Sequence, residues 1–116
     1  MVLVVEDEFT VRCSIAASLR DAGYIVVECS SGEEAITLCK SNTSIDIVFT
    51  DINLGGPATG WDVAEYFRLD RPAILVLYTS GKSIDPQRRV SGSVFVAKPY
   101  DSSDILEACR RVTAGA

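Results

Sequence analysis

Acidic, hydroxyl-bearing and basic side chains in this sequence follow closely after short apolar runs. Glu6 and Asp7 follow the first run, Asp51 and Thr79 follow the third and fourth runs, and Lys98 follows the fifth. If the runs are parallel strands, their carboxyl ends meet at one edge of a sheet, which is where such sheets bind ligands. We therefore expect three carboxylates, one hydroxyl and one ammonium to lie close together.

The chemistry expected of this group is phosphoryl chemistry assisted by a metal ion. Two carboxylates in contact repel each other by ~4 kcal/mol at an effective dielectric constant of about 20, so a cluster of three needs a cation. The chain has no histidine, and oxygen donors alone favour Mg²⁺, which keeps bound waters and accepts phosphate oxygens. Asp51 is the best candidate nucleophile, because aspartyl phosphate is an established covalent intermediate.

Lys98 and Thr79 complete this set, since they supply a charge and a hydroxyl donor for phosphoryl oxygens. Each residue alone has an ordinary structural explanation. Aspartates at strand ends are mostly caps or turn residues, a single lysine mostly lies at the surface, and a threonine in this place mostly caps a helix. Only the joint placement of the five residues favours a functional site.

The elements that must position these residues alternate along the chain. Nearly unbroken apolar runs, typical of strands covered on both faces, lie at residues 2–5, 24–27, 45–49, 73–78 and 94–97. Segments with helical spacing lie between and after them, at residues 9–22, 32–40, 61–69 and 102–113. Residues 81–92 contain Pro86 and few apolar anchors, so we expect only a short or irregular helix there. This alternation predicts five βα units and an α/β sandwich with a parallel sheet.

Residues at the ends of these segments agree with the assignment. Gly23 is placed to end the first helix. Ser31 and Glu34 fit a capping box at the start of the second, and Asp101 is placed to cap the last.

The composition excludes several classes of function. With 116 residues, 47% of them hydrophobic, the chain suits a single domain with one core, expected over residues 1–116. A net charge of −5 argues against direct nucleic-acid binding. Residues 73–78, the longest apolar stretch, are too few to span a bilayer, and no signal peptide is visible, so we expect a cytoplasmic protein with no membrane insertion. Four cysteines without CxxC spacing fit a reducing compartment and argue against a zinc site.

Four segments of the chain together resemble the response-regulator receiver domain of two-component signalling. They are residues 2–8, 46–54, 74–81 and 94–100, each at the end of a predicted strand. The resemblance covers essentially the whole chain. It implies a flavodoxin-like (βα)5 three-layer sandwich with a five-stranded parallel sheet in the order 2-1-3-4-5.

The resemblance also implies a role for each acidic residue. Asp51 corresponds to the phosphoacceptor, and Glu6 and Asp7 correspond to the acidic pair that holds Mg²⁺ together with it. Asn53 occupies the position whose backbone carbonyl binds the metal. No further cofactor is expected.

The remaining roles belong to the conformational switch. By position, Thr79 resembles the switch hydroxyl, Lys98 the lysine of the site and Phe95 the aromatic switch residue. The Lys98-Pro99 pair resembles a cis peptide that aims the lysine into the site.

The sequence departs from the family pattern around the site. Gly55 stands where the family usually has proline, and the loop at residues 55–60 is slightly longer than the common form. The stretch from Thr79 to Lys98 is shorter than usual, and Phe95 replaces a frequent tyrosine.

The function implied is a phosphorylation-controlled switch. A histidine kinase or a histidine phosphotransfer domain is the expected donor to Asp51, and a downstream protein or an attached output domain is the expected receiver of the signal, with a homodimer as a further option. The chain is expected to be a regulatory phosphoacceptor that assists its own phosphorylation and dephosphorylation, not an enzyme acting on other substrates.

Three other functions remain as alternatives to a phosphorylation-controlled switch. A small Mg²⁺-dependent aspartyl-phosphate phosphatase would have a second acid where this chain has Asn53. A degenerate receiver would bind partners without phosphorylation. A flavodoxin-like FMN binder would need a phosphate-binding loop where this chain has Glu6-Asp7-Glu8, which would repel phosphate.

Overall fold

The apolar runs form a central sheet whose two faces are both covered by helices. The computed structural model describes residues 1–42, 44–81 and 87–115. Its five parallel strands are ordered β2-β1-β3-β4-β5, which confirms the flavodoxin-like α/β architecture and the predicted strand order. The strands are β1 (Val2–Val5), β2 (Val26–Cys29), β3 (Ile47–Asp51), β4 (Leu75–Ser80) and β5 (Val94–Ala97).

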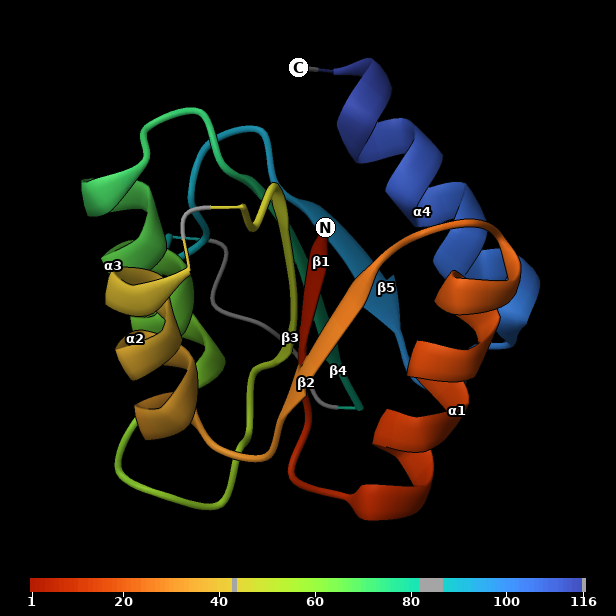
Figure 1. Ribbon diagram of the computed structural model, residues 1–116, viewed down its shortest axis with the longest axis horizontal. Coiled ribbons are helices and arrows are strands. Elements are labelled where there is room, and N and C mark those ends of the chain that lie inside the picture. The colour runs from red at the N-terminus through yellow and green to blue at the C-terminus, as the bar shows by residue number, and fades with distance from the viewer. Residues whose placement is uncertain (43, 82–86, 116) are drawn as a thin grey trace.

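Four helices in the described part of the chain form the two outer layers. They are α1 (Phe9–Asp21), α2 (Gly32–Ser41), α3 (Gly60–Asp70) and α4 (Ser102–Ala114). Figure 1 shows the sheet nearly edge-on, with α2 and α3 on one face and α1 and α4 on the other. None of these helices has the length and apolarity needed to cross a membrane.

Alternate residues of each strand supply two separate cores. Leu3 and Val48 pack with Phe67 in the core under α2 and α3. Val4 and Phe49, which point to the opposite face, pack in the core under α1 and α4. Strands covered on both faces must be apolar at nearly every position, which explains why the runs are unbroken.

Apolar spacing and capping residues in the sequence predicted each helix end to within one residue of its observed position. Gly23 follows α1 with a φ of 97°, a conformation that glycine adopts without steric cost. Ser31 accepts a hydrogen bond from the backbone N–H of Glu34, and Asp101 accepts one from the N–H of Asp104. A further capping box between Thr59 and Asp62 starts α3 and was not predicted.

The predicted bounds of β2, β3 and β4 are wrong by about two residues. Each strand begins and ends later than its apolar run, because strand pairing decides where a ladder begins. Val2 pairs with Val26 and Ile47, so the residues before those two lie outside the sheet. The shift carries polar residues into the strand ends, and Asp51 becomes the direct Cα partner of Thr79 in the β3–β4 pair.

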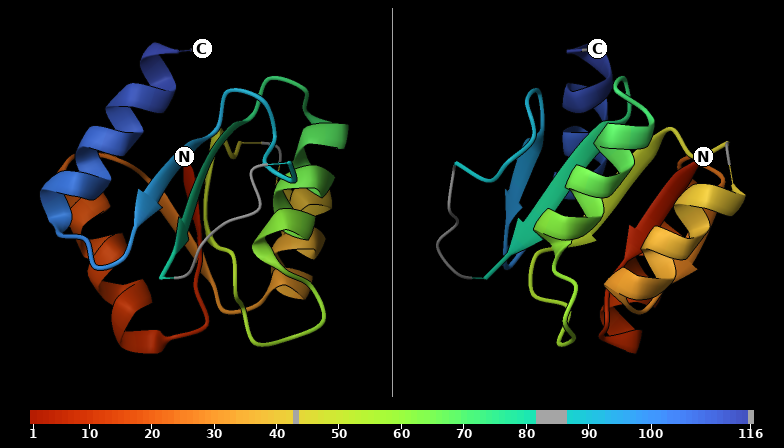
Figure 2. Two further views of the ribbon diagram at one scale, coloured as in Figure 1. Left: turned by 180° about the vertical axis from the view of Figure 1, so that it is seen from behind. Right: turned by 90° about the vertical axis from the view of Figure 1, so that its left-hand side faces the viewer.

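The fourth connection, where a short or irregular helix was expected over residues 81–92, lies partly outside the described residues. Residues 82–86 of that stretch lie outside the described part of the chain, and residues 87–93 form turns. Arg88 donates to Glu65 at 2.8 Å and to Asp62 at 3.2 Å, both on α3. The N–H of Val90 donates to the hydroxyl of Tyr78 at 3.1 Å. This segment therefore lies beside α3, as the left view in Figure 2 shows.

Candidate functional site

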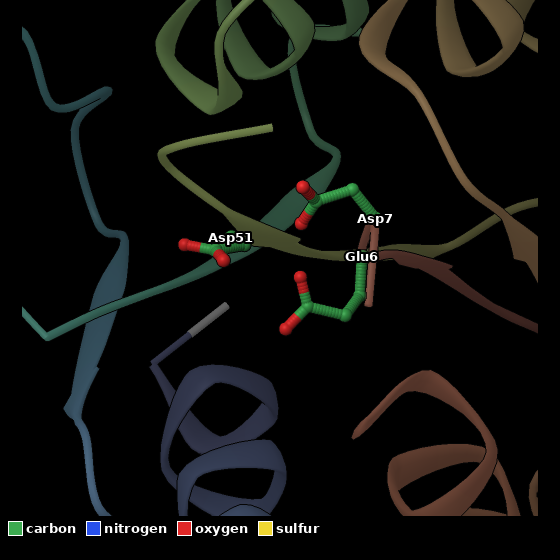
Figure 3. A group of neighbouring side chains, drawn as sticks. All are labelled: Glu6, Asp7 and Asp51. Atoms are coloured by element: carbon green, nitrogen blue, oxygen red, sulfur yellow. The ribbon is translucent and has the colours of Figure 1, made fainter. Parts of the chain in front are cut away.

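Three carboxylates meet where β1 and β3 end. Glu6 follows directly after β1 and is 1% exposed, Asp51 ends β3 and is 6% exposed, and Asp7 is exposed. One oxygen from each carboxylate lies within 4.8 Å of the other two. Figure 3 shows the side chains grouped around one space. The structure therefore brings the predicted acidic residues together.

Lys98, just beyond β5, joins two of these carboxylates. Its Nζ donates to Asp51 Oδ2 at 3.0 Å and to Glu6 Oε1 at 3.4 Å. The other Asp51 oxygen accepts from the backbone N–H of Asn53 at 3.3 Å. The Lys98-Pro99 peptide is cis, as the resemblance implied. The side chain of Asn53 is exposed, and the metal-binding role of its carbonyl stays a prediction.

The pocket carries more negative than positive charge. Burial and, after it, the neighbouring charge of Asp51 raise the pKa of Glu6 to about 7, against the smaller opposing effect of Lys98. Burial lowers the pKa of Lys98, but the hydrogen bond to Asp51 and the charges of Asp51 and Glu6 outweigh it, so the net shift is upward. One ammonium among three carboxylates leaves room for a further cation.

The donor set fits Mg²⁺. All three groups offer oxygen, and Glu6 Oε2 is buried without a hydrogen-bond partner among the described residues. One oxygen from each carboxylate lies within 4.8 Å of the other two, so rotation of the side chains would let all three oxygens face one ion.

Thr79 and Phe95 lie on opposite faces of the sheet. Thr79 is 1% exposed and lies two residues after Leu77, whose side chain packs under α1 and α4. Its hydroxyl has no hydrogen-bond partner in the described part of the chain. Phe95 is half-buried and packs against the other core, under α2 and α3. The structure therefore places Thr79 beside the pocket and Phe95 away from it.

Two glycines shape the loop between Asp51 and α3. Gly55 has a φ of 75°, which proline cannot adopt, so the departure from the family pattern has a backbone cause. A Cβ on Gly60 would lie 2.2 Å from the backbone oxygen of Asp51. Only glycine therefore allows α3 to begin this close to the end of β3.

Tyr100 is part of the pocket but was not singled out from the sequence. Its ring packs edge-on against Phe49, with centroids 6.4 Å apart, and its hydroxyl is buried without a partner among the described residues. Phe49 lies two residues before Asp51 on the same face of β3. The position of Tyr100 directly after Lys98-Pro99 was the available signal.

A groove of about 680 Å³ opens beside the pocket. It is lined by residues of α1 and of the start of α4, Val11 and Ile105 among them, and by Lys98. The groove gives a second molecule a surface next to Asp51.

A family profile described as the response regulator receiver domain matches residues 2–110 of this sequence. The chain belongs to that family. Receiver domains bind Mg²⁺ at an acidic pocket and are regulatory parts of two-component systems, and this chain has an acidic cluster of Glu6, Asp7 and Asp51.

Individual proteins agree with this assignment. The transcriptional regulatory protein PdtaR of Mycobacterium tuberculosis is 32% identical over 111 residues, which are 92% of this chain and 53% of that protein. The two-component response regulator ORR5 of rice is 27% identical over 117 residues, covering 96% of this chain and 87% of that protein. The chain spans about half the length of the first curated relatives it matches.

Solved structures show the same fold. A response regulator receiver protein from Sinorhizobium medicae superimposes with a TM-score of 0.92 at 32% identity, over 99% of this chain and 95% of that one. The receiver domain of the hybrid histidine kinase CckA gives a TM-score of 0.83 at 30% identity, over 96% of both chains.

Proposed function

We propose that this receiver domain is a phosphorylation-controlled switch in which Asp51 accepts a phosphoryl group from a histidine kinase or a histidine phosphotransfer domain. The observation that carries the proposal is the bridge from Lys98 to Asp51 and Glu6 inside a cluster of three carboxylates. A buried arrangement with this surplus of negative charge gains little stability by itself. Its residue types suit phosphoryl transfer, which depends on positioning and charge neutralisation.

Each residue has a distinct part in the transfer. An Asp51 carboxylate oxygen forms the new P–O bond, while the P–N bond of the phosphohistidine breaks and its electron pair stays on the imidazole nitrogen. The Lys98 ammonium moves from the Asp51 carboxylate to a phosphoryl oxygen. Its Nζ already lies 3.0 Å from Asp51 Oδ2, so only a short movement is needed. The same charged groups assist hydrolysis of the acyl phosphate, in which water attacks phosphorus and the Asp51 carboxylate leaves.

Glu6, Asp7 and Asp51 would hold Mg²⁺, together with the backbone carbonyl of Asn53. When bound, the ion neutralises the charge that develops on the transferring phosphoryl group. Glu6 Oε2, buried and unpartnered in the described part of the chain, supports this assignment from the protein side.

Thr79 and Phe95 would convert phosphorylation into a change of surface. Thr79 approaches the phosphoryl oxygens, and the movement of the end of β4 changes the packing of the half-buried ring of Phe95 on the neighbouring strand β5. The surface affected comprises residues 87–93, β5 and α4, which lie around Phe95. Two populated arrangements of this surface provide the switch.

The donor would approach along the groove beside α1. Lys98 is among the residues that line that groove, so a helix seated in it brings its histidine toward Asp51. Phe9, which is 69% exposed at the start of α1, extends this surface. Exposed apolar groups next to a reaction site favour a protein partner.

Residues 1–116 would form one receiver domain that passes its signal to an attached output domain, to a separate downstream protein or to a second copy. We place it in the cytoplasm, where the kinase domains of two-component systems act. A net charge of −5 argues against direct contact with nucleic acid.

The test is incubation with Mg²⁺ and acetyl phosphate, followed by intact-protein mass measurement. One phosphoryl adduct is expected in the unaltered protein. The Asp51→Asn variant, which lacks the acceptor carboxylate, should show none. Asp70→Asn, an exposed carboxylate on α3, is the matched control and should keep the adduct. An adduct that persists in Asp51→Asn would refute the acceptor, and no adduct in the unaltered protein would favour a degenerate receiver.

A further inference from the structure

Two buried hydroxyls near Asp51 lack hydrogen-bond partners among the described residues. They belong to Thr79 and Tyr100. A buried polar group without a partner is unfavourable, and native structures contain few of them. Two such groups on one side of one pocket indicate a shared acceptor that the protein does not itself supply.

The fold directs both hydroxyls toward the same space. Asp51 and Thr79 are Cα partners in the β3–β4 register. Tyr100 lies on the same face of the sheet, because its ring packs edge-on against Phe49, with an interplanar angle of 75°. Burial raises the pKa of the Tyr100 hydroxyl, against the lowering effects of the Lys98 charge and of the nearby Thr79 hydroxyl, which faces it without forming a hydrogen bond of good geometry. The phenol therefore stays protonated and remains a donor.

We propose that the Tyr100 hydroxyl is a second hydroxyl donor to the phosphoryl group on Asp51, alongside Thr79. The inference rests on the proposed function and extends it to a residue outside the expected set. A phosphoryl group presents three terminal oxygens with strong acceptor capacity. Lys98, Thr79 and Tyr100 each offer a donor near Asp51, and Phe95, which has no hydroxyl, offers none.

The test compares the affinity of the unaltered protein and of Tyr100→Phe for beryllium fluoride in the presence of Mg²⁺, measured by titration calorimetry. Beryllium fluoride binds aspartate as a tetrahedral anion and needs no donor protein. Tyr100→Phe keeps the ring against Phe49 and removes only the hydroxyl. A hydrogen bond to a charged acceptor predicts about tenfold weaker binding.

A stability measurement separates this role from a structural one. Without ligand, Tyr100→Phe should unfold at the same urea concentration as the unaltered protein or a higher one, because an unpartnered buried hydroxyl is lost. Tyr78→Phe is the matched control: its hydroxyl accepts from Val90, away from the pocket, so this variant should lose stability and keep its affinity. Equal affinity in Tyr100→Phe would overturn the inference.

A second background tests direct donation. In Thr79→Val, the change Tyr100→Phe should still weaken binding severalfold, because a hydrogen bond from Tyr100 directly to the phosphoryl group does not need the Thr79 hydroxyl. No further loss in that background would mean that Tyr100 acts only through Thr79, which overturns direct donation. Failure of the unaltered protein to bind beryllium fluoride or to form an acetyl phosphate adduct would instead overturn the proposed function.

Discussion

The carboxylate of Glu6 is almost fully buried and lies beside a second buried carboxylate, Asp51. Its raised pKa of about 7 means that ionisation of Glu6 destabilises the metal-free folded protein. The unfolded chain binds this proton only below a pKa of about 4.3, whereas the folded chain keeps it up to about pH 7. The folded state therefore binds more protons across this window.

Without metal, the free energy of unfolding should fall as pH rises from about 4.5 to about 7 and then level off. The sign follows because a proton held more tightly by the folded state stabilises it at low pH, and the expected size is on the order of 2–3 kcal/mol. Urea unfolding in chelator at pH 5 and pH 8 measures it. Glu6→Gln, which cannot ionise, should lack this part of the slope; an equal slope in that variant would contradict the assignment.

At the residue scale, the sequence predicted the acidic cluster and Lys98 because strand ends place their side chains at one edge. It did not predict Tyr100, since a tyrosine after a proline has no distinctive spacing. Nor did it predict that Phe95 packs on the opposite face from Thr79, which depends on the register between β4 and β5. Such register is set by pairing across the sheet and leaves no local trace.

At the element scale, helices were predicted more accurately than strands. Capping residues such as Ser31 and Asp101 fix a helix end locally. A strand ends where its partner ends, so β3 continues through Thr50 to Asp51 although the apolar run stops at Phe49. In the described part of the fourth connection, Arg88 forms side-chain ion pairs with Asp62 and Glu65 on α3, which apolar spacing in the sequence does not indicate.

The start of α3 is the most tightly constrained junction near the site. Gly60→Ala should lower the free energy of unfolding by about 3 kcal/mol or more, because the new Cβ would meet the Asp51 backbone at 2.2 Å. Gly115→Ala is the matched control, since its Cβ would make ordinary contact at 3.6 Å. Urea unfolding compares the two, and equal small losses would show that α3 moves away freely.

Ion pairs should anchor residues 87–93 to α3. Arg88→Gln removes both pairs, so amide exchange at Val90 should accelerate severalfold while overall stability changes by less than about 1 kcal/mol, as for exposed pairs. Arg110→Gln, which removes an exposed pair with Glu107, is the control and should leave Val90 unchanged. Unchanged exchange in Arg88→Gln would show that backbone contacts hold the segment.

At the scale of the whole molecule, metal binding should appear as a gain in global stability. A ligand that binds only the folded state adds ~1.4 kcal/mol for each tenfold excess over its Kd. Mg²⁺ should therefore raise the Tm at pH 8 by more than NaCl of equal ionic strength. Asp7→Asn should lose most of this rise, and Glu107→Gln, an exposed carboxylate on α4, should keep it; an equal rise in both would place the ion elsewhere.

The fluorescence of the sole tryptophan of the chain should report on the interior near the site. Trp61, the second residue of α3, packs against Tyr78, with ring centroids 4.8 Å apart. Tyr78 immediately precedes Thr79 in β4. Any displacement of this strand end changes the surroundings of the indole, so the molecule carries an intrinsic optical probe, and its ultraviolet emission would follow the switch in real time without an attached dye.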